Sequence, residues 1–399
     1  MKKIIIALLL TIFTLSVNAD SINLYSNNAI VINLNDLNIL YEKNSNEQIY
    51  IASLTKIMTA IVAIEQIDDL SKEVTITEEM LSGIYEYSKA GLQLGDIVTY
   101  EDLLYGVILP SGADCVQAIE QSLGGREKFV SLMNELARKL NLEKTHFSNG
   151  IGMDEDNYSS VSDVATLLTY ALKNKTFDKI YTTKEYTMSN GLKVSATVEH
   201  YNSLDTTKIT GSKTGFTNAA GFCISVIYKS EDYNYLIVTA NADYTLGMPT
   251  HVMDAVTLIN YYLDNYHYIT IYNKNDNILS IPIMDSKQKK YDIKSLEEIK
   301  LFVKKDVEEK DLQVDLKQIN NITKYNKKGD YLGTLNVKHQ NEIIYTKDLY
   351  LLSEIKYKTD INPILIIILI VFLVLLTIYN ILLRKKIHRL IIRLKNKAK

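Results

Sequence analysis

The chain has 399 residues, of which 47% are hydrophobic and 23% charged, and its formal net charge is −3. This length is sufficient for a large buried core and for more than one domain. The acidic balance argues against nucleic-acid binding, and a total of two cysteines excludes a disulfide framework. The six histidines are scattered without the spacing of metal ligands, so we expect no metal site.

The first 19 residues, 1–19, have the pattern of a secretory signal peptide. A basic start is followed by an apolar stretch at residues 4–15, and Val17-Asn18-Ala19 resembles a cleavage site between small residues. A membrane anchor is the alternative, but the apolar stretch is short for one. We therefore expect an exported protein whose mature chain begins at Asp20.

The segment from residue 53 to 64 is predicted to be a helix with two polar side chains on one face. Ser53 and Lys56 are three residues apart, which places them one helical turn apart. The apolar run at 57–64 would bury the lysine, and burial lowers the pKa of an amine until it can accept a proton. A hydroxyl beside such an amine can act as a nucleophile. The alternative is a chance Ser-x-x-Lys in a lysine-rich chain.

A second serine, Ser111, is predicted to lie in a loop between two helices. The apolar segment 103–109 ends at Pro110, and residues 114–123 have a helical pattern. This loop would present the Ser111 hydroxyl between the two predicted helices. Taken alone, a Ser-Gly pair after proline is simply a turn.

The third motif is Lys213-Thr214-Gly215, which precedes a strand predicted at 222–228. The glycine would let the backbone of a ligand come close, because it has no Cβ atom. The lysine offers a point charge for a carboxylate, and its positive potential would help to keep Lys56 neutral. Taken alone, it is a solvated lysine at the end of a strand.

The remaining pattern up to residue 267 indicates a mixed α/β domain. Strands at 221–228 and 235–241 are predicted to form a hairpin. Helices are predicted at 129–140, 164–172 and 252–263. Two cysteines, Cys115 and Cys223, are expected to be small apolar core residues, although a bridge between them is compatible with an exported protein.

Between residues 268 and 358 the long helical patterns disappear. Leu335 and Val337 alternate with polar residues, as do Leu312, Val314 and Leu316. The sequence therefore predicts a small β-rich domain. It is either a spacer between the preceding domain and a membrane or a module that binds a partner.

A second apolar segment, at residues 361–383, has about the 20 residues that a bilayer-spanning helix needs. The tail at 384–399 carries eight Lys and Arg residues and no acidic residue. The positive-inside bias puts such a tail in the cytoplasm, against the anionic inner leaflet. We therefore expect a C-terminal transmembrane anchor with the acidic remainder of the chain outside. A buried core helix is the alternative.

Together the three motifs resemble the signature of penicillin-binding proteins and serine β-lactamases. The chain is most similar to the low-molecular-mass penicillin-binding proteins, which are serine-type D-Ala-D-Ala carboxypeptidases of the peptidase S11 type. The resemblance is strong over roughly residues 22–265. The segments that carry it are 41–44, 52–60, 99–106, 109–112, 211–217 and 220–223.

This resemblance implies a penicillin-binding, β-lactamase-like transpeptidase fold of the α/β (α+β) class. A five-stranded antiparallel sheet flanked by helices would lie beside an all-α part that carries the nucleophile. The catalytic domain would span residues 20–267 and the β-rich domain residues 268–358.

The resemblance also implies a role for each motif residue. Ser53 would be the acyl-ester nucleophile, Lys56 its proton acceptor, and Ser111 a proton shuttle. The substrate's terminal carboxylate would be held by Lys213 with help from Thr214. Gly215 and Phe216 would complete the substrate site, with the backbone N–H groups of Ser53 and Phe216 as an oxyanion hole.

The implied reaction is removal of the terminal D-Ala from peptidoglycan stem pentapeptides, without a cofactor. β-Lactam antibiotics would acylate the same serine, and the membrane would be the remaining partner. One position departs from the family's Ser-x-Asn motif, because Ala113 replaces the asparagine. A lost hydrogen bond of this kind costs about 1–3 kcal/mol, unless Asp114 or a water compensates.

Two alternatives remain open. A serine β-lactamase of class A would carry a glutamate four residues before an asparagine between the second and third motifs, and none is found there. A catalytically weak penicillin-binding scaffold is the other alternative, because of Ala113.

Overall fold

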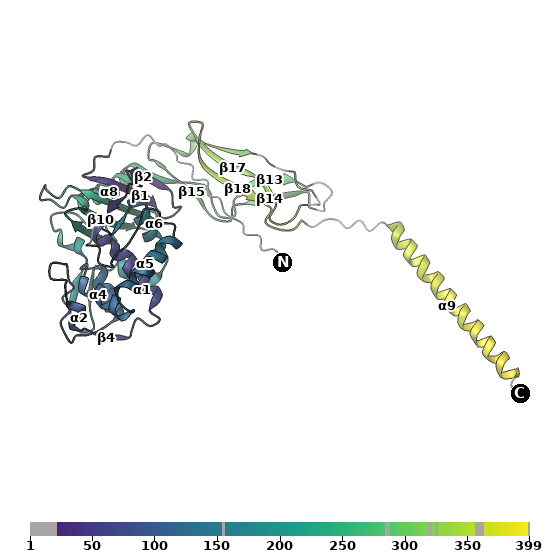
Figure 1. The fold of residues 1–399 in the computed structure, drawn as a ribbon. Helices are drawn as coiled ribbons and strands as arrows, with labels where there is room; N and C mark the ends of the chain where they lie inside the picture. The colour runs from purple at the N-terminus through teal and green to yellow at the C-terminus, as the bar shows by residue number, and fades with distance from the viewer. Residues whose placement is uncertain are drawn as a thin grey trace. The chain divides into compact units, whose positions relative to one another are not determined.

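The computed structural model describes residues 22–153, 156–283, 288–317, 319, 321–323, 326–355 and 363–397. The chain divides into two compact units, Met1–His267 and Tyr268–Lys399 (Figure 1). The signal peptide expected at residues 1–19 lies outside the described residues, as do the start of the expected membrane segment and the last two residues of the basic tail.

The first unit contains the predicted five-stranded sheet. The strand order is β2-β1-β11-β10-β9, and every neighbouring pair is antiparallel. The strands are β1 (Ser26–Asn33), β2 (Ile39–Lys43), β9 (Gly211–Thr217), β10 (Gly221–Lys229) and β11 (Asn234–Ala242). The predicted hairpin is thus confirmed as β10 and β11. Strand β9, which carries the Lys-Thr-Gly motif, is an edge strand with one side free of strand partners.

The central strands are buried on both faces because helices cover the sheet. Six consecutive residues of β11 are buried, and both α6 (Val161–Ala171) and α8 (Thr250–Asn265) pack against this strand. Such a strand is an almost continuous apolar run without polar alternation. This architecture fixes the position of β9 at one edge.

The helical part of the unit is built around α1 (Thr55–Gln66). Its first nine residues are all buried, whichever direction their side chains take, so this helix is the core of the α-part. Helix α1 packs against α3 (Tyr100–Ile108), α4 (Ala113–Ser122), α5 (Arg126–Lys139) and α7 (Lys175–Tyr181). All the helices predicted in this unit are present, within a few residues of the expected bounds.

Short elements join the sheet to the helices. Three two-stranded pairs form, β3 with β6, β4 with β5 and β7 with β8. Their bounds, with those of the short helices, are β3 (Ile49–Tyr50), η1 (Ala52–Leu54), β4 (Glu73–Thr75), α2 (Glu78–Leu81), β5 (Ile97–Thr99), β6 (Tyr158–Ser159), β7 (Glu185–Thr187), β8 (Lys193–Ser195) and η2 (Thr197–His200).

The second unit contains the predicted β-rich domain. Its sheets are β16-β17-β18, β13-β14 and β12-β15, and its core includes Leu332, Leu335 and Leu351, all fully buried. The elements are β12 (Tyr266–Tyr272), β13 (Asn277–Pro282), β14 (Lys290–Lys294), β15 (Ile299–Lys304), η3 (Glu309–Asp311), β16 (Leu312–Lys317), β17 (Tyr331–His339) and β18 (Glu342–Tyr350).

The last helix, α9 (Pro363–Lys397), is long and apolar enough to cross a membrane. The most apolar 18-residue window within Ile364–Leu394 has a mean hydropathy of 3.1, and none of that window is buried in the protein. The helix does not stop at residue 383 but continues through the basic tail. At 1.5 Å per residue it exceeds the roughly 30 Å of a bilayer's hydrocarbon core, so its basic end extends beyond that layer.

Candidate active site

The first motif forms a tight turn leading into α1. Ala52 has a φ of +46°, which is rare for a residue with a Cβ atom and marks local backbone strain. This turn presents the Ser53 hydroxyl to the first turn of the helix. The Nζ atom of Lys56 lies 3.0 Å from Ser53 Oγ and donates a 2.7 Å hydrogen bond to the Ile151 carbonyl.

The amine of Lys56 is buried, and burial changes its protonation. Its side chain is 1% exposed, and desolvation lowers its pKa to about 7, against the opposing attraction of the Asp114 and Glu120 carboxylates. A substantial fraction of the amine is therefore neutral near pH 7. An uncharged amine at hydrogen-bond distance from a hydroxyl can accept the proton of that hydroxyl.

Ser111 lies in the loop between α3 and α4, as the sequence predicted. Its φ is +63°, and its side chain is almost wholly buried. Within the described part of the chain, its Oγ atom has no hydrogen-bond partner. A buried hydroxyl without a partner costs free energy, so such an atom is typical of a site that awaits a ligand or a reacting group.

The third motif brings a second buried lysine to the same region. Lys213 on β9 is fully buried, and its Nζ atom donates a 2.7 Å hydrogen bond to the Thr214 carbonyl. Burial, and then the charge of Lys56, hold the pKa of Lys213 well below its usual value. The two amines are thus close enough to influence one another.

Gly215 explains how β9 can lie against the turn that carries Ser53. A Cβ atom on Gly215 would lie 3.0 Å from the backbone nitrogen of Ser53 and 3.2 Å from the Ile51 carbonyl oxygen. Any larger residue would push the strand and the turn apart. The next residue, Phe216, is exposed on the edge of the sheet.

The structure adds two groups that the sequence analysis missed. The Ile151 carbonyl holds Lys56, and the Thr197 hydroxyl in η2 lies 2.6 Å from the Thr214 hydroxyl. Thr197 also donates its backbone N–H to the Leu109 carbonyl, two residues before Ser111. It therefore links the second motif to the third. No periodicity marks either residue in the sequence.

A close approach of two loops fixes the Ile151 carbonyl. Asn149 accepts hydrogen bonds from the backbone N–H groups of Ile151 and Gly152. Gly152 has a φ of +84°, and a Cβ atom there would lie 2.1 Å from the Ala52 carbonyl oxygen. The two glycines that flank Ile151, in a chain with 16 glycines, are a sequence signal of this close contact that the sequence analysis did not use.

At the second motif, Asp114 does not take the place of the missing asparagine. Its carboxylate accepts hydrogen bonds from the backbone N–H groups of Ala90, Gly91 and Leu92, so it faces that loop. Ala113 itself is fully buried at the start of α4. These three hydrogen bonds commit the Asp114 carboxylate to the loop at residues 90–92.

Two further observations bear on other kinds of site. Cys115 and Cys223 are both free and buried. Among the described residues, no three His, Cys, Asp or Glu side chains are grouped to hold a metal ion.

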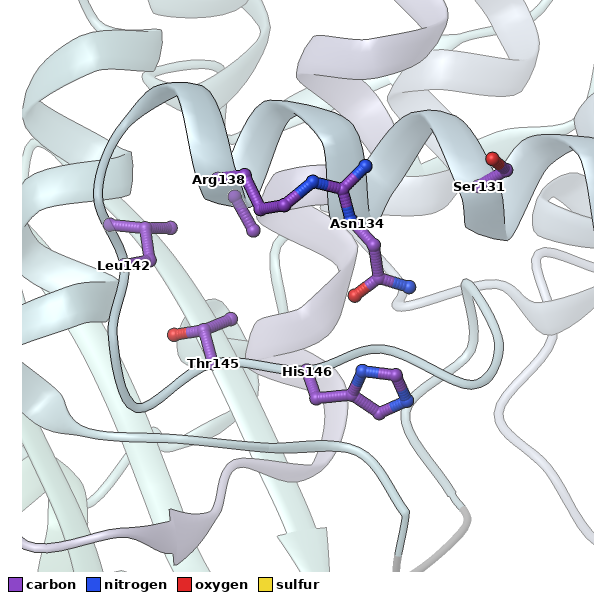
Figure 2. A pocket seen from close by; sticks show the side chains of 7 residues that line it. Ser131, Asn134, Arg138, Leu142, Thr145 and His146 are labelled. Carbon is purple, nitrogen blue, oxygen red and sulfur yellow. The ribbon is translucent and has the colours of Figure 1, made fainter.

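A hollow of about 410 Å³ beside α5 contains no motif residue; Figure 2 shows Asn134, Arg138 and His146 around it. Asn134 is held by hydrogen bonds to the backbone of Phe147.

Comparison with known proteins decides the family. A model of the D-alanyl-D-alanine carboxypeptidase family, peptidase S11, matches residues 14–244. The chain belongs to this family. A model of the penicillin-binding protein 5 C-terminal domain matches residues 266–357 of this family member. The resemblance inferred from the three motifs is thus confirmed.

Individual relatives and a solved structure are also similar to this chain. D-alanyl-D-alanine carboxypeptidase DacF of Bacillus subtilis is 28% identical over 79% of this chain and 82% of its own. The D-alanyl-D-alanine carboxypeptidase of Streptomyces sp. strain K15 is 32% identical over 56% of this chain and 81% of its own. Penicillin-binding protein 5 from Haemophilus influenzae has a TM-score of 0.71 at 22% identity, covering 85% of this chain and 99% of its own. This last likeness confirms the transpeptidase fold.

Proposed function

We propose that this chain removes the terminal D-Ala from peptidoglycan stem pentapeptides through an acyl-enzyme on Ser53. The observation that carries the proposal is the 3.0 Å contact between Ser53 Oγ and a Lys56 amine whose pKa burial lowers to about 7. This pair supplies the nucleophile and the base of an acyl transfer without any cofactor.

In the acylation step, Lys56 takes the proton of Ser53 while Oγ attacks the carbonyl carbon of the penultimate D-Ala. The negative charge that develops on the carbonyl oxygen is stabilised by the backbone N–H groups of Ser53 and Phe216. Ser111 gives its proton to the leaving amine and takes the proton held by Lys56, the C–N bond breaks, and free D-Ala departs while Lys56 is neutral again. Each of the two backbone N–H donors of such an oxyanion hole stabilises the transition state by a few kcal/mol.

In the second step, a water attacks the ester carbonyl. Its proton moves to Lys56 by way of Ser111, the C–O bond to Ser53 breaks, and Oγ recovers a proton. The buried Ser111 hydroxyl without a partner supports this role, because it has both a donor and an acceptor site free.

The substrate's carboxylate is assigned to Lys213 and Thr214. Lys213 is buried, and an opposite charge close to its amine favours the protonated form that can pair with a carboxylate. Thr214 is oriented for this by the hydroxyl of Thr197. Gly215 leaves the backbone of β9 accessible, so that the substrate adds to the free edge of the sheet as a further strand.

We further propose the membrane topology. The mature chain begins at Asp20 after export, with the catalytic domain at 20–267 and the β-rich domain at 268–358 outside the cell. Residues 361–383 cross the membrane, and the basic residues of 384–399 stay on the cytoplasmic side. Deleting residues 359–399 should release active protein into the medium; activity that remains with the membrane would contradict this topology.

Three measurements test the function itself. Labelled penicillin should modify the purified full-length protein and its Ser230→Ala control, an exposed serine in the β10–β11 turn, but not Ser53→Ala. D-Ala should be released from a pentapeptide by the same two active proteins. Equal labelling of all three would end the assignment to Ser53, and labelling without D-Ala release would favour a catalytically weak scaffold. Turnover of nitrocefin faster than release of D-Ala would favour a β-lactamase.

A further inference from the structure

A hollow of about 490 Å³ opens at the end of the sheet where β10 begins and β11 ends. It lies next to the edge strand that carries the third motif, and the proposed mechanism does not use it. The side chains that line it include Asn27, Asn218, Asn241, Asp243, Tyr244 and Leu246.

Three carboxamides in this hollow are free to bind a ligand. The side chains of Asn27, Asn218 and Asn241 make no hydrogen bond within the described part of the chain. Each carboxamide offers two donors and an acceptor. Asn241 is also held at a φ of +54°, so its backbone direction is fixed by the end of the strand. Asp243, by contrast, is engaged by the backbone N–H and hydroxyl of Thr245.

Aromatic rings stand beside these carboxamides. The Tyr244 ring meets the Phe216 ring edge-on, with 5.2 Å between centroids, and 37% of Tyr244 and 42% of Phe216 is exposed. Both rings are supported from behind by Phe222, which stacks on His251 at 4.6 Å. The outer rings are therefore held in place although they face solvent.

Free carboxamides around fixed aromatic rings are the chemistry that binds a sugar. The amides pair with hydroxyl and N-acetyl groups, and a ring face covers the C–H side of the pyranose. A charged side chain of a peptide would fit this hollow less well than a sugar. Asp243 is the charged residue that lines the hollow, and its carboxylate is already bonded to Thr245.

The distance from the nucleophile also fits a sugar. If the carboxylate is held at Lys213 and Thr214, the acyl part of the substrate must run along β9 toward Thr217. Four extended residues on that side span about 13 Å. Asn218 lines the hollow and is three residues beyond Gly215, or roughly 10 Å along the strand, which is within that reach.

We propose that this hollow binds the N-acetylated sugar to which the stem peptide is attached. This inference rests on the proposed function, because it extends the same substrate site. The enzyme thereby prefers stem pentapeptides on glycan over free pentapeptides, and Tyr244 is a specificity-determining residue. Its substitution should lower the preference for the glycan-linked substrate over the free peptide.

The first test compares kcat/KM for a disaccharide-linked pentapeptide with that for the free pentapeptide. The full-length enzyme in detergent should favour the glycan-linked substrate, and Tyr244→Ala should reduce that preference roughly fivefold to tenfold. Tyr233→Ala is the matched control, since Tyr233 lies at the opposite end of the β10–β11 hairpin, and it should keep the preference. Equal values of kcat/KM for the two substrates in the unmodified enzyme would overturn the proposal.

A second test does not depend on catalysis. Ser53→Ala protein should bind a peptide-free disaccharide of the glycan by calorimetry, and adding Asn218→Ala or Tyr244→Ala should weaken that binding. If D-Ala release fails but disaccharide binding is found, the proposed function is wrong while the sugar site stands. If no disaccharide binding is found at millimolar concentration, the sugar site is wrong whatever the enzyme releases.

Discussion

The Thr197 and Thr214 hydroxyls lie 2.6 Å apart and join η2 to the edge strand of the sheet. Thr197 is at the same time bonded through its backbone N–H to Leu109, in the segment that leads to Ser111. One residue thus holds the strand that we propose receives the substrate's carboxylate and the loop that carries Ser111. Its hydroxyl orients Thr214, whereas its backbone positions the loop.

The Thr197→Val variant separates these two contributions. It keeps the shape and the backbone hydrogen bond but removes the hydroxyl, so Thr214 is free to rotate. Loss of one hydrogen bond of this kind is worth about 1 kcal/mol, which corresponds to roughly a fivefold change in an equilibrium. We expect KM for the pentapeptide to rise about fivefold with little change in kcat.

Thr197→Ser is the control for this variant. It restores the hydroxyl and should return KM to within about twofold of the original value. A fall in kcat with unchanged KM would mean that Thr197 acts on the reaction and not on the orientation of Thr214. A melting temperature lowered equally in both variants would assign the residue a purely structural role.

The buried Lys56 amine predicts how stability depends on pH. Its pKa is about 7 in the folded protein and about 10.4 in an unfolded chain. Between these values the unfolded state binds more protons, so the free energy of unfolding rises as pH rises through this interval. Below it both states are protonated, and the folded protein carries the full cost of a buried charge.

The Lys56→Met variant tests this directly. The apolar side chain has a similar length and no charge, so the variant should be more stable than the original near pH 7 and lose this part of the pH dependence. It should also fail to be acylated by penicillin. In the original protein, the acylation rate should rise with an inflection near pH 7, because only the neutral amine accepts a proton. A flat acylation profile from pH 5 to pH 8 would contradict the role of Lys56 as base.

The sequence predicted the parts of the site that local spacing determines. Ser53 and Lys56 are one turn apart on the same chain segment, so helical geometry alone brings them together. Lys213 to Gly215 lie on one strand, and the family resemblance identified them. The Ile151 carbonyl was missed because its contact with Lys56 spans 95 positions and involves a backbone atom, which any residue type supplies.

The sequence also did not predict how deeply the two lysines, Lys56 and Lys213, are buried. The apolar run after Lys56 indicated partial burial, whereas the structure encloses α1 on all sides. For Lys213, the sequence was equally compatible with a solvated lysine at the end of a strand. Full burial there depends on how η1 and η2 pack against β9, and these contacts are long-range. The last helix continues past the expected membrane segment at 361–383, since a run of basic residues does not interrupt helical hydrogen bonding.

Ala113 offers a gain-of-function prediction. In the family motif this position is an asparagine, and Asp114 faces the 90–92 loop instead of replacing it. The Ala113→Asn variant should therefore shorten the lifetime of the penicilloyl-enzyme and raise kcat for D-Ala release, by about tenfold if one hydrogen bond to the reacting groups is restored. Ala113→Leu, which adds volume without an amide, is the control and should lower activity. No change in deacylation with Asn would mean that another group already serves this role.

The buried Lys213 amine predicts proton uptake when the substrate binds. Desolvation and the charge of Lys56 hold its pKa well below the usual value in the empty site. A bound carboxylate reverses this, because an opposite charge within a few ångströms favours the protonated amine and raises the pKa. Near pH 8, calorimetry of Ser53→Ala protein with a D-Ala-D-Ala peptide should therefore show uptake of up to one proton, measured from the dependence of the heat on buffer ionisation enthalpy.

Lys213→Arg is the control that assigns this proton. A guanidinium stays charged when the site is empty, so the variant should bind the peptide with little proton uptake. A peptide amidated at its C-terminus should show no uptake with either protein, because it brings no negative charge. Equal uptake by Lys213→Arg and the parent protein would place the proton on Lys56, and the carboxylate would then be held beside the nucleophile's own base.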